Sequence, residues 1–395
     1  MKISDINKES CCGCTGCLCV CPKSAISMKT DDQGFEYPEI NENLCVDCGL
    51  CYNVCKNSSL FKYPILECYA AKNSNADVVM SSSSGGLVDA LCNVLFEEQG
   101  VVYGAAYNDN FELVYKRAQN IDESIAFRGS KYVQASLGTV FQDVLQDLNN
   151  EKKVLFIGPS CFLAGLYSYL DSKKCCINNL FTVDFICHGV PSPGIFKQYV
   201  QYVNNNSSLS DIVFRNKKDK NGRQLHIPWK YGRYNCALIY KNGYREVNTL
   251  KSRIFLNLFT SNNCLRPHCY QCRFIGIEKP GDITVADYWG IEEVHSDFAD
   301  NNGVSAIMIH SEKGTELFKK CHNIEYIVSS IDKISLKQGM LRSASPKGKD
   351  YDEFWNDFYN KGFAYIAKKY GEYSILGKVH QSKLYSIYSK IRYGE

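Results

Sequence analysis

The strongest constraint on this 395-residue chain is a cysteine spacing that occurs twice near its N-terminus. Each repeat reads C-x2-C-x2-C-x3-C, and the two repeats comprise Cys11, Cys14, Cys17 and Cys21, then Cys45, Cys48, Cys51 and Cys55. A loop with this spacing wraps three corners of a cubane 4Fe-4S cluster, while its fourth thiolate binds the neighbouring cluster. The repeats therefore predict a bacterial-ferredoxin-like domain with two 4Fe-4S clusters over residues 1–60.

The crossing of the fourth thiolate determines which cysteines share a cluster. We predict one cluster on Cys11, Cys14, Cys17 and Cys55, and a second on Cys45, Cys48, Cys51 and Cys21. Two other uses of cysteine fit the spacing less well. Zinc sites usually take their ligands as two separated pairs, and disulfides need an oxidising compartment.

Composition limits the setting in which such a chain works. The chain has 21 cysteines, which indicates a reducing environment. No apolar segment of the signal-peptide type precedes the clusters, and no run of 18 apolar residues occurs. The net charge of +3 gives no reason to expect nucleic-acid binding. We therefore expect a cytoplasmic redox protein.

Hydrophobic periodicity predicts an α/β domain and a helical tail after the clusters. A strand over 154–157, a helix over 162–170 and a strand over 181–186 together are typical of a partly parallel sheet. We predict an α/β domain with a mixed sheet over 67–345 and a helical basic tail over 346–395. This tail is expected to cap the domain, and the alternative is contact with an anionic membrane or a partner protein.

Two further cysteines follow predicted strands of the α/β domain. Cys161 and Cys187 lie where α/β sheets bind ligands, at the carboxyl ends of strands. The pair Cys269-x2-Cys272 supplies two more thiolates, and Cys264 is a reserve ligand. Four thiolates suit a third 4Fe-4S cluster or a structural zinc ion. Beside two ferredoxin clusters, we predict a third 4Fe-4S cluster on Cys161, Cys187, Cys269 and Cys272.

A serine- and glycine-rich run precedes the predicted helix that begins at Leu87. The run, from Ser81 to Gly86, reads SSSSGG. At this position it offers free backbone N–H groups and the positive end of the helix dipole to an anion. Ordinary N-capping explains the same residues, so the spacing alone leaves phosphate binding and capping open.

Several motifs in one order make the chain resemble the family of the beta subunit of coenzyme F420-reducing hydrogenase and dehydrogenase. The matching stretches are Ser83–Gly86, Gly129–Tyr132, Gly158–Leu166, Asp184–Pro193, Arg266–Phe274 and Gly281–Gly290. The resemblance implies a flavin, FAD or FMN, in an α/β flavin-binding domain, with a 4Fe-4S cluster beside it. It also implies that the flavin contacts Ser83, Ser84, Gly85, Gly86, Gly129, Ser130, Lys131 and Tyr132.

One loop departs from the family pattern. The family commonly has Gly-Thr-Pro-Cys-Gln where this chain has Gly158-Pro-Ser-Cys161-Phe162. The cysteine is kept, but the threonine and glutamine that can hydrogen-bond a flavin or substrate are absent. The departure therefore weakens the expectation of a deazaflavin substrate more than that of a cluster.

These features predict an iron–sulfur flavoprotein oxidoreductase that passes electrons between its clusters and a small organic substrate. His188, Lys131 and Asp287 are the candidate catalytic residues. Each also has an ordinary explanation, as a loop histidine, a surface charge and a turn residue. A ferredoxin or another redox protein is the expected partner. Two alternatives stay open, namely a deazaflavin oxidoreductase subunit and a non-catalytic electron carrier that docks a partner enzyme.

Overall fold

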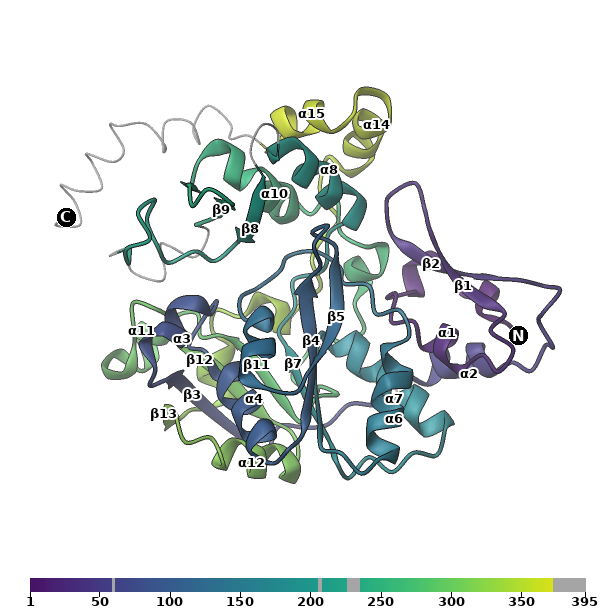
Figure 1. Ribbon diagram of the computed structural model, residues 1–395, viewed down its shortest axis with the longest axis horizontal. Helices are drawn as coiled ribbons and strands as arrows, with labels where there is room; N and C mark the ends of the chain where they lie inside the picture. The colour runs from purple at the N-terminus through teal and green to yellow at the C-terminus, as the bar shows by residue number, and fades with distance from the viewer. Residues whose placement is uncertain (59–60, 205–207, 226–234, 372–395) are drawn as a thin grey trace.

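An eight-stranded mixed sheet forms the centre of the computed structural model, which describes residues 1–58, 61–204, 208–225 and 235–371. The strand order is β13-β3-β12-β11-β7-β6-β4-β5 (Figure 1). The strands are β3 (Glu67–Asn73), β4 (Val101–Tyr107), β5 (Leu113–Ala118), β6 (Val154–Ile157), β7 (Leu180–Phe185), β11 (Ile283–Asp287), β12 (Ser305–Ile309) and β13 (Ile324–Val328). The predicted α/β architecture with a mixed sheet is confirmed.

The middle of this sheet is parallel. Strand β6 pairs in parallel with β4 and with β7, and β7 pairs in parallel with β11. The carboxyl ends of β4, β6, β7 and β11 therefore lie along one edge, where α/β sheets bind ligands. The outer pairs β4–β5, β11–β12, β12–β3 and β13–β3 are antiparallel.

Helices cover both faces of the sheet (Figure 1). Helices α4 (Leu87–Glu97) and α12 (Glu312–Lys319) lie on one face, and α6 (Val140–Asn149) and α7 (Ser160–Ser172) lie on the other. Side chains of a strand alternate between faces. In β6, Leu155 accordingly packs in the α4 cluster, while Val154 and Phe156 pack in the α7 cluster. The shorter helices around the sheet are α3 (Ala76–Ser81), α5 (Ile121–Ser124), α11 (Ile291–Val294) and α13 (Ile331–Ser335).

A second sheet stands apart from the first. Its strands are β8 (Leu209–Val213), β9 (Ala237–Tyr240) and β10 (Arg245–Val247), in the order β10-β9-β8. It packs with α8 (Pro193–Val203) and α10 (Leu250–Thr260) through a core that includes Phe196, Tyr199 and Phe255.

The predicted tail begins with two helices. They are α14 (Tyr351–Lys361) and α15 (Phe363–Ile366), and they are followed by a short π-helix at Ala367–Gly371. The last part of the predicted basic tail, residues 372–395, lies outside the described residues. Within the described ranges, no helix combines the length and the apolar character needed to cross a membrane.

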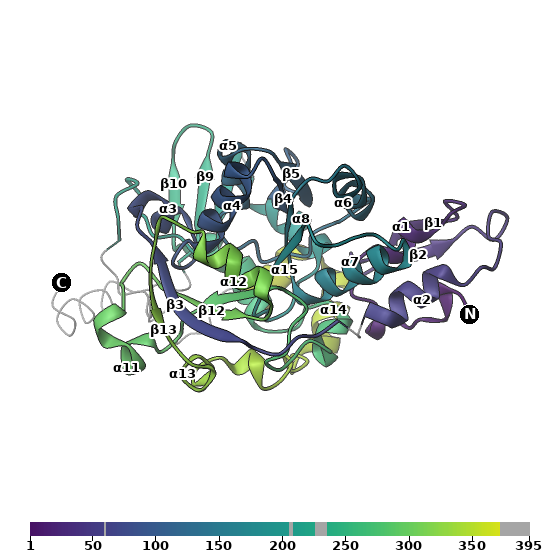
Figure 2. The same cartoon turned by 90° about the horizontal axis from the view of Figure 1, so that it is seen from below.

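The N-terminal module packs against α7. It consists of a hairpin of β1 (Ile26–Thr30) and β2 (Glu36–Ile40) with helices α1 (Gly16–Val20) and α2 (Leu50–Asn57). Figure 2 shows the module at one end of the molecule, with α1 and α2 beside α7. The Ser168 hydroxyl donates to the Val54 carbonyl at 2.7 Å, and the Gln142 amide donates to the Cys19 carbonyl at 3.1 Å.

Candidate functional site

The cysteines predicted to bind the second cluster line one small cavity in the N-terminal module. These are Cys21, Cys45, Cys48 and Cys51. The loop between them turns through Asp47 and Gly49, which have φ angles of 53° and 72°. Glycine adopts the second of these angles at little cost. Cys48 is exposed, so this set of thiols, here called the outer set, reaches the molecular surface.

The cysteines predicted to bind the first cluster lie together against the main domain. They are Cys11, Cys14, Cys17 and Cys55, here called the inner set. Burial raises the pKa of the Cys17 thiol, and the negative charges of Cys11 and Cys55 raise this pKa further. Helix α7 approaches so closely that a Cβ atom on Gly165 would lie 2.7 Å from the Cys14 sulfur. The inner set therefore sits at the interface between the module and the α/β domain.

The four cysteines predicted to hold a third cluster line one cavity of the α/β domain. Cys161 comes from the first turn of α7, which follows β6, and Cys187 comes from the loop after β7. Cys269 and Cys272 come from the short helical turn at Pro267–Gln271 and its end. Their neighbours around the cavity include Phe162, Phe274, Ile275 and Met340. The reserve residue Cys264 is fully buried elsewhere and donates to the Leu258 carbonyl. We call the four cavity cysteines the third set.

The donor chemistry of the third set fits a metal centre. Burial raises the pKa of Cys187 to about 11 and raises the pKa of Cys269 further still. Thiolates in such surroundings need a nearby cation to become stable, and metal binding releases their protons. Within the described residues, no three cysteine, histidine or acidic side chains converge closely enough to hold a single metal ion. All four thiols line the same cavity.

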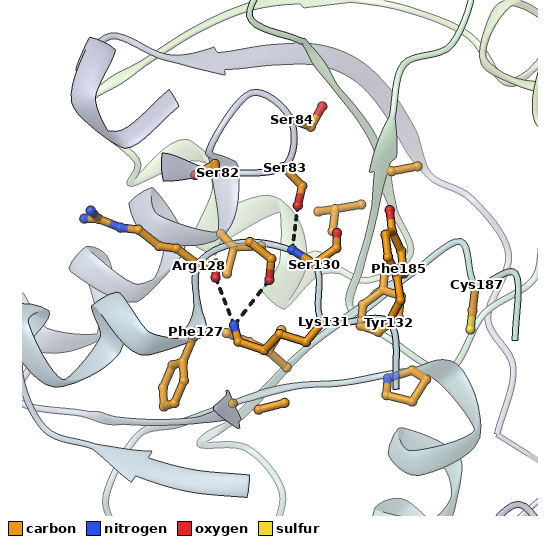
Figure 3. Close-up of a pocket in the computed structure, with 18 of the residues that line it drawn as sticks. Ser82, Ser83, Ser84, Phe127, Arg128, Ser130, Lys131, Tyr132, Phe185 and Cys187 are labelled. Carbon is orange, nitrogen blue, oxygen red and sulfur yellow. Dashed lines mark hydrogen bonds between the residues drawn. The ribbon is translucent and has the colours of Figure 1, made fainter. Parts of the chain in front are cut away.

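A larger cavity of about 340 Å³ opens at the carboxyl edge of the parallel strands (Figure 3). Ala105, Ile157, Phe185 and Asp287 bring four neighbouring strands or their ends to its wall. Volumes of 300–1,000 Å³ are typical of cofactor and small-molecule sites. The sequence-predicted residues that line the cavity are Ser83, Ser84, Gly86, Gly129, Ser130, Lys131, Tyr132, His188 and Asp287.

Two loops meet at one wall of this cavity. The Ser130 backbone N–H donates to the Ser83 hydroxyl at 2.6 Å, so the serine run and the Gly129–Tyr132 loop are joined (Figure 3). The Ser84 hydroxyl donates to the Val304 carbonyl at 2.8 Å. Gly85 lies behind the wall and does not line the cavity, because it packs on the β3 backbone. A Cβ atom at Gly85 would lie 2.6 Å from the Ala71 carbonyl oxygen.

Lys131 brings a buried amine to the same wall. Its ammonium donates to the Arg128 and Gly129 carbonyls at 2.9 and 3.3 Å (Figure 3). Burial lowers the pKa of Lys131 to about 8, and the negative charge of Asp211 opposes that shift. A bound anion would favour the charged amine, because opposite charges stabilise each other most strongly away from water. The wall thus has the chemistry of a phosphate site, together with the N-terminal turn of α4.

The other two candidate catalytic residues are already engaged by neighbours. The His188 ring hydrogen-bonds the Asn262 side chain at 2.7 Å and packs edge-on against Phe259. Burial lowers the pKa of His188, which favours a neutral ring. Asp287 forms an ion pair with Arg215 at 2.8 Å. Arg215 also donates to the Tyr132 hydroxyl at 3.2 Å. The geometry therefore favours a positioning role for Asp287 over proton transfer.

The large cavity and the third-set cavity share a wall. Residues 187–190, at the carboxyl end of β7, line both cavities. Pro159 and Phe162 also line both. The structure thus brings the third set and the large cavity to opposite sides of one short loop.

Sequence reasoning missed two residues that lie between the inner and third sets. Cys12 follows Cys11 in the chain but lines the third-set cavity, with its sulfur 3.9 Å from the Cys161 carbonyl oxygen. Arg266 lies in the same loop as Cys269 and extends toward Cys11. The adjacent cysteines at 11 and 12 could have indicated that Cys12 lies near a cluster site. No sequence pattern indicates that an arginine will be buried.

Comparisons with known proteins agree with the resemblance read from the sequence. Residues 151–333 match the family described as the C terminus of the coenzyme F420 hydrogenase/dehydrogenase beta subunit, and residues 38–60 match the 4Fe-4S binding domain family. The suspected resemblance is thereby confirmed. The Ser83–Gly86 and Gly129–Tyr132 stretches lie outside the matched residues, so their flavin-binding role stays a prediction.

One solved structure extends the fold likeness. It is a chain from a structure described as a xenon derivatization of the F420-reducing NiFe hydrogenase complex from Methanosarcina barkeri. The TM-score is 0.50 and the sequence identity is 14%, over 74% of this chain and 93% of that chain. At this identity the likeness concerns the fold. No curated protein matches the chain.

Proposed function

We propose that this chain, which resembles the beta-subunit family of coenzyme F420 hydrogenase and dehydrogenase over residues 151–333, is an iron–sulfur flavoprotein oxidoreductase. In this proposal the three thiol sets hold 4Fe-4S clusters, and the large cavity holds FAD or FMN. The observation that carries the proposal is the wall at residues 187–190, which the third set and the large cavity share.

The arrangement of the thiol sets supports electron transfer through the molecule. The outer set reaches the surface at Cys48, where a redox protein can exchange electrons. The inner set lies against α7. Cys12, the residue after Cys11 of the inner set, lines the third-set cavity. Each set therefore adjoins the next, and the last adjoins the large cavity. The position of the third set beside two sets with ferredoxin spacing supports a 4Fe-4S cluster over one zinc ion.

A bound flavin would supply the hydride chemistry with the substrate. The chain's own residues would bind and orient that group. Ser83 and Ser130 join the two loops of the wall, and the Lys131 amine would neutralise a phosphate. His188 would contact the flavin or the substrate from the shared wall. Asp287, paired with Arg215, would hold Tyr132 in place through the same guanidinium.

Metal and flavin analysis of anaerobically purified protein tests this proposal. Bound flavin with about twelve irons per chain supports it, since three cubanes contain about four irons each. About eight irons with no flavin would instead indicate a non-catalytic electron carrier whose main domain docks a partner enzyme. Zinc in place of the last four irons would remove the third cluster from the proposal but leave the flavin.

A deazaflavin oxidoreductase subunit is the second candidate, because the matched family carries that name. Phe162, which replaces the family's glutamine, lines both cavities and is almost fully buried. An apolar ring here removes a hydrogen-bonding group from the substrate side, which counts against this candidate. Reduction of the bound flavin by reduced deazaflavin, but not by reduced ferredoxin, would favour it over the first.

A further inference from the structure

Arg266 connects the inner thiol set with the loop that carries the third set. It is among the largest fully buried side chains of the protein, with 1% of its surface exposed. Its backbone belongs to the third-set loop, since its N–H donates to the Val190 carbonyl and its carbonyl accepts from the Cys269 N–H at 2.8 Å. Its side chain points the other way, into the N-terminal module.

The guanidinium is held almost entirely by the module. Its Nε donates to the Cys11 carbonyl at 2.7 Å, and its Nη2 donates to the Glu36 carbonyl at 2.9 Å and to the Cys11 sulfur at 3.4 Å. The guanidinium lies 4.3 Å from the Tyr37 ring centroid. Its Nη1 donates to the Gln134 side chain at 2.9 Å, and Gln134 in turn donates to the Cys12 carbonyl.

Gly13 makes this approach feasible. Its φ angle is 77°, and a Cβ atom at this position would lie 3.0 Å from Arg266 Nη1 and 2.5 Å from Gln134 Nε2. A side chain would therefore displace the guanidinium from the Cys11 loop. The glycine serves the docking of Arg266 as well as the turn of the cysteine motif.

A buried arginine needs a compensating negative charge. None of the hydrogen-bond partners of Arg266 within the described residues is a carboxylate. A 4Fe-4S cluster on four thiolates carries net negative charge, and this charge increases on reduction. Hydrogen bonds to the sulfurs and nearby charges set the potential of such clusters.

We propose that Arg266 is a positioning residue that holds the inner cluster beside the third set and raises the reduction potential of that cluster through its contact with Cys11. The inference rests on the proposed function, because it requires a 4Fe-4S cluster on the inner set. It goes beyond that function because it states that Arg266, a residue of the main domain, sets the reduction potential of the inner cluster. Electrons arriving from the outer set would be drawn toward the interface.

The test is an EPR-monitored redox titration of the full-length protein with iron analysis. Arg266→Met removes the charge and the donors at similar volume, and Arg266→Lys keeps the charge but cannot reproduce the fork of donors. Arg223→Met is the matched control, because it removes the same charge from an exposed arginine that lines neither the third-set cavity nor the large cavity.

We expect one midpoint potential to shift downward in Arg266→Met, to shift less in Arg266→Lys, and to stay near its original value in Arg223→Met. Selective loss of about four irons from both Arg266 variants, with Arg223→Met intact, would support the holding role. An unchanged midpoint in either iron-replete Arg266 variant would overturn the proposal. An original protein without 4Fe-4S signals would instead refute the proposed function.

Discussion

Gly34 and Gly194 meet backbone to backbone where the N-terminal module contacts the start of α8. A Cβ atom on Gly194 would lie 2.9 Å from the Gly34 Cα, and one on Gly34 would lie 2.6 Å from the Gly194 Cα. The Ser192 hydroxyl beside them donates to the Gln33 carbonyl. The hairpin loop of the module thus contacts the start of α8 so closely that neither glycine position has room for a side chain.

This contact predicts a reversal of an ordinary helix preference. Alanine normally stabilises a helix by about 1 kcal/mol relative to glycine. We expect Gly194→Ala instead to lower the free energy of unfolding by about 1–3 kcal/mol, because the added methyl overpacks the contact. Denaturant unfolding measures this, and hydrogen exchange over residues 31–35 shows whether the module loosens. Gly339→Ala is the control, because a Cβ atom at Gly339 meets nothing within 4 Å. Equal stability of the two variants would contradict the expectation.

The third set predicts a selective loss of metal. Cys269→Ala is expected to lose about four irons per chain, because a cubane that loses one of four thiolates is poorly held. Cys264→Ala is the control in the same loop, since Cys264 is fully buried but does not line the cavity. Iron and zinc analysis of both variants provides the measurement. Full iron in Cys269→Ala would remove that residue from the ligand set.

Lys131 predicts a pH dependence of flavin binding. In the free protein its pKa is lowered to about 8 by burial. Contact with a phosphate would raise this pKa, so binding above pH 8 takes up a proton. The dissociation constant should be flat below pH 8 and rise by up to about tenfold per pH unit above it. Fluorescence titration of flavin-free protein between pH 7 and 10 measures this.

The matched variants for that titration are Lys131→Met and Lys116→Met. The first should bind flavin more weakly at pH 7 and show no rise above pH 8. The second removes an exposed lysine on β5 that does not line the cavity, and it should behave as the original protein does. If the dissociation constant of Lys131→Met still rises above pH 8, the proton taken up on binding belongs to another group.

The ion pair between Arg128 and Asp89 should support the cavity wall. The two side chains lie 2.6 Å apart and are 18% and 5% exposed. Arg128 also supplies a carbonyl to Lys131. In a double-mutant cycle of Arg128→Met and Asp89→Asn, we expect a coupling energy of roughly 1–3 kcal/mol from denaturant unfolding. Flavin retention should fall in both single variants. A coupling energy near zero would mean that the pair does not stabilise the wall.

Local sequence patterns predicted the features that are formed by residues close together in the chain. The outer set and the unit of β6, α7 and β7 follow from cysteine spacing and hydrophobic runs, and the structure shows both. The strand-end argument also anticipated that Cys161 and Cys187 lie together. Their role as ligands remains a prediction, as does the flavin.

Contacts between distant segments left no comparable pattern. Strand β13, and the pairing of β8, β9 and β10 into a sheet of their own, were not anticipated, because pairing partners depend on the whole fold. Gly85 was predicted to contact a flavin, but the structure places it behind the wall against β3. Arg266 was missed for the same reason, since the module that surrounds it lies far away in the sequence.

The position of β3 has a consequence for synthesis. Although β3 begins the α/β domain, it pairs with β12 and β13 from the other end of that domain. The central sheet therefore closes only after β13 has left the ribosome, whereas the N-terminal module emerges first and domains tend to fold in that order. The inner thiols are therefore synthesised well before the sheet that positions α7 over Cys14 is complete.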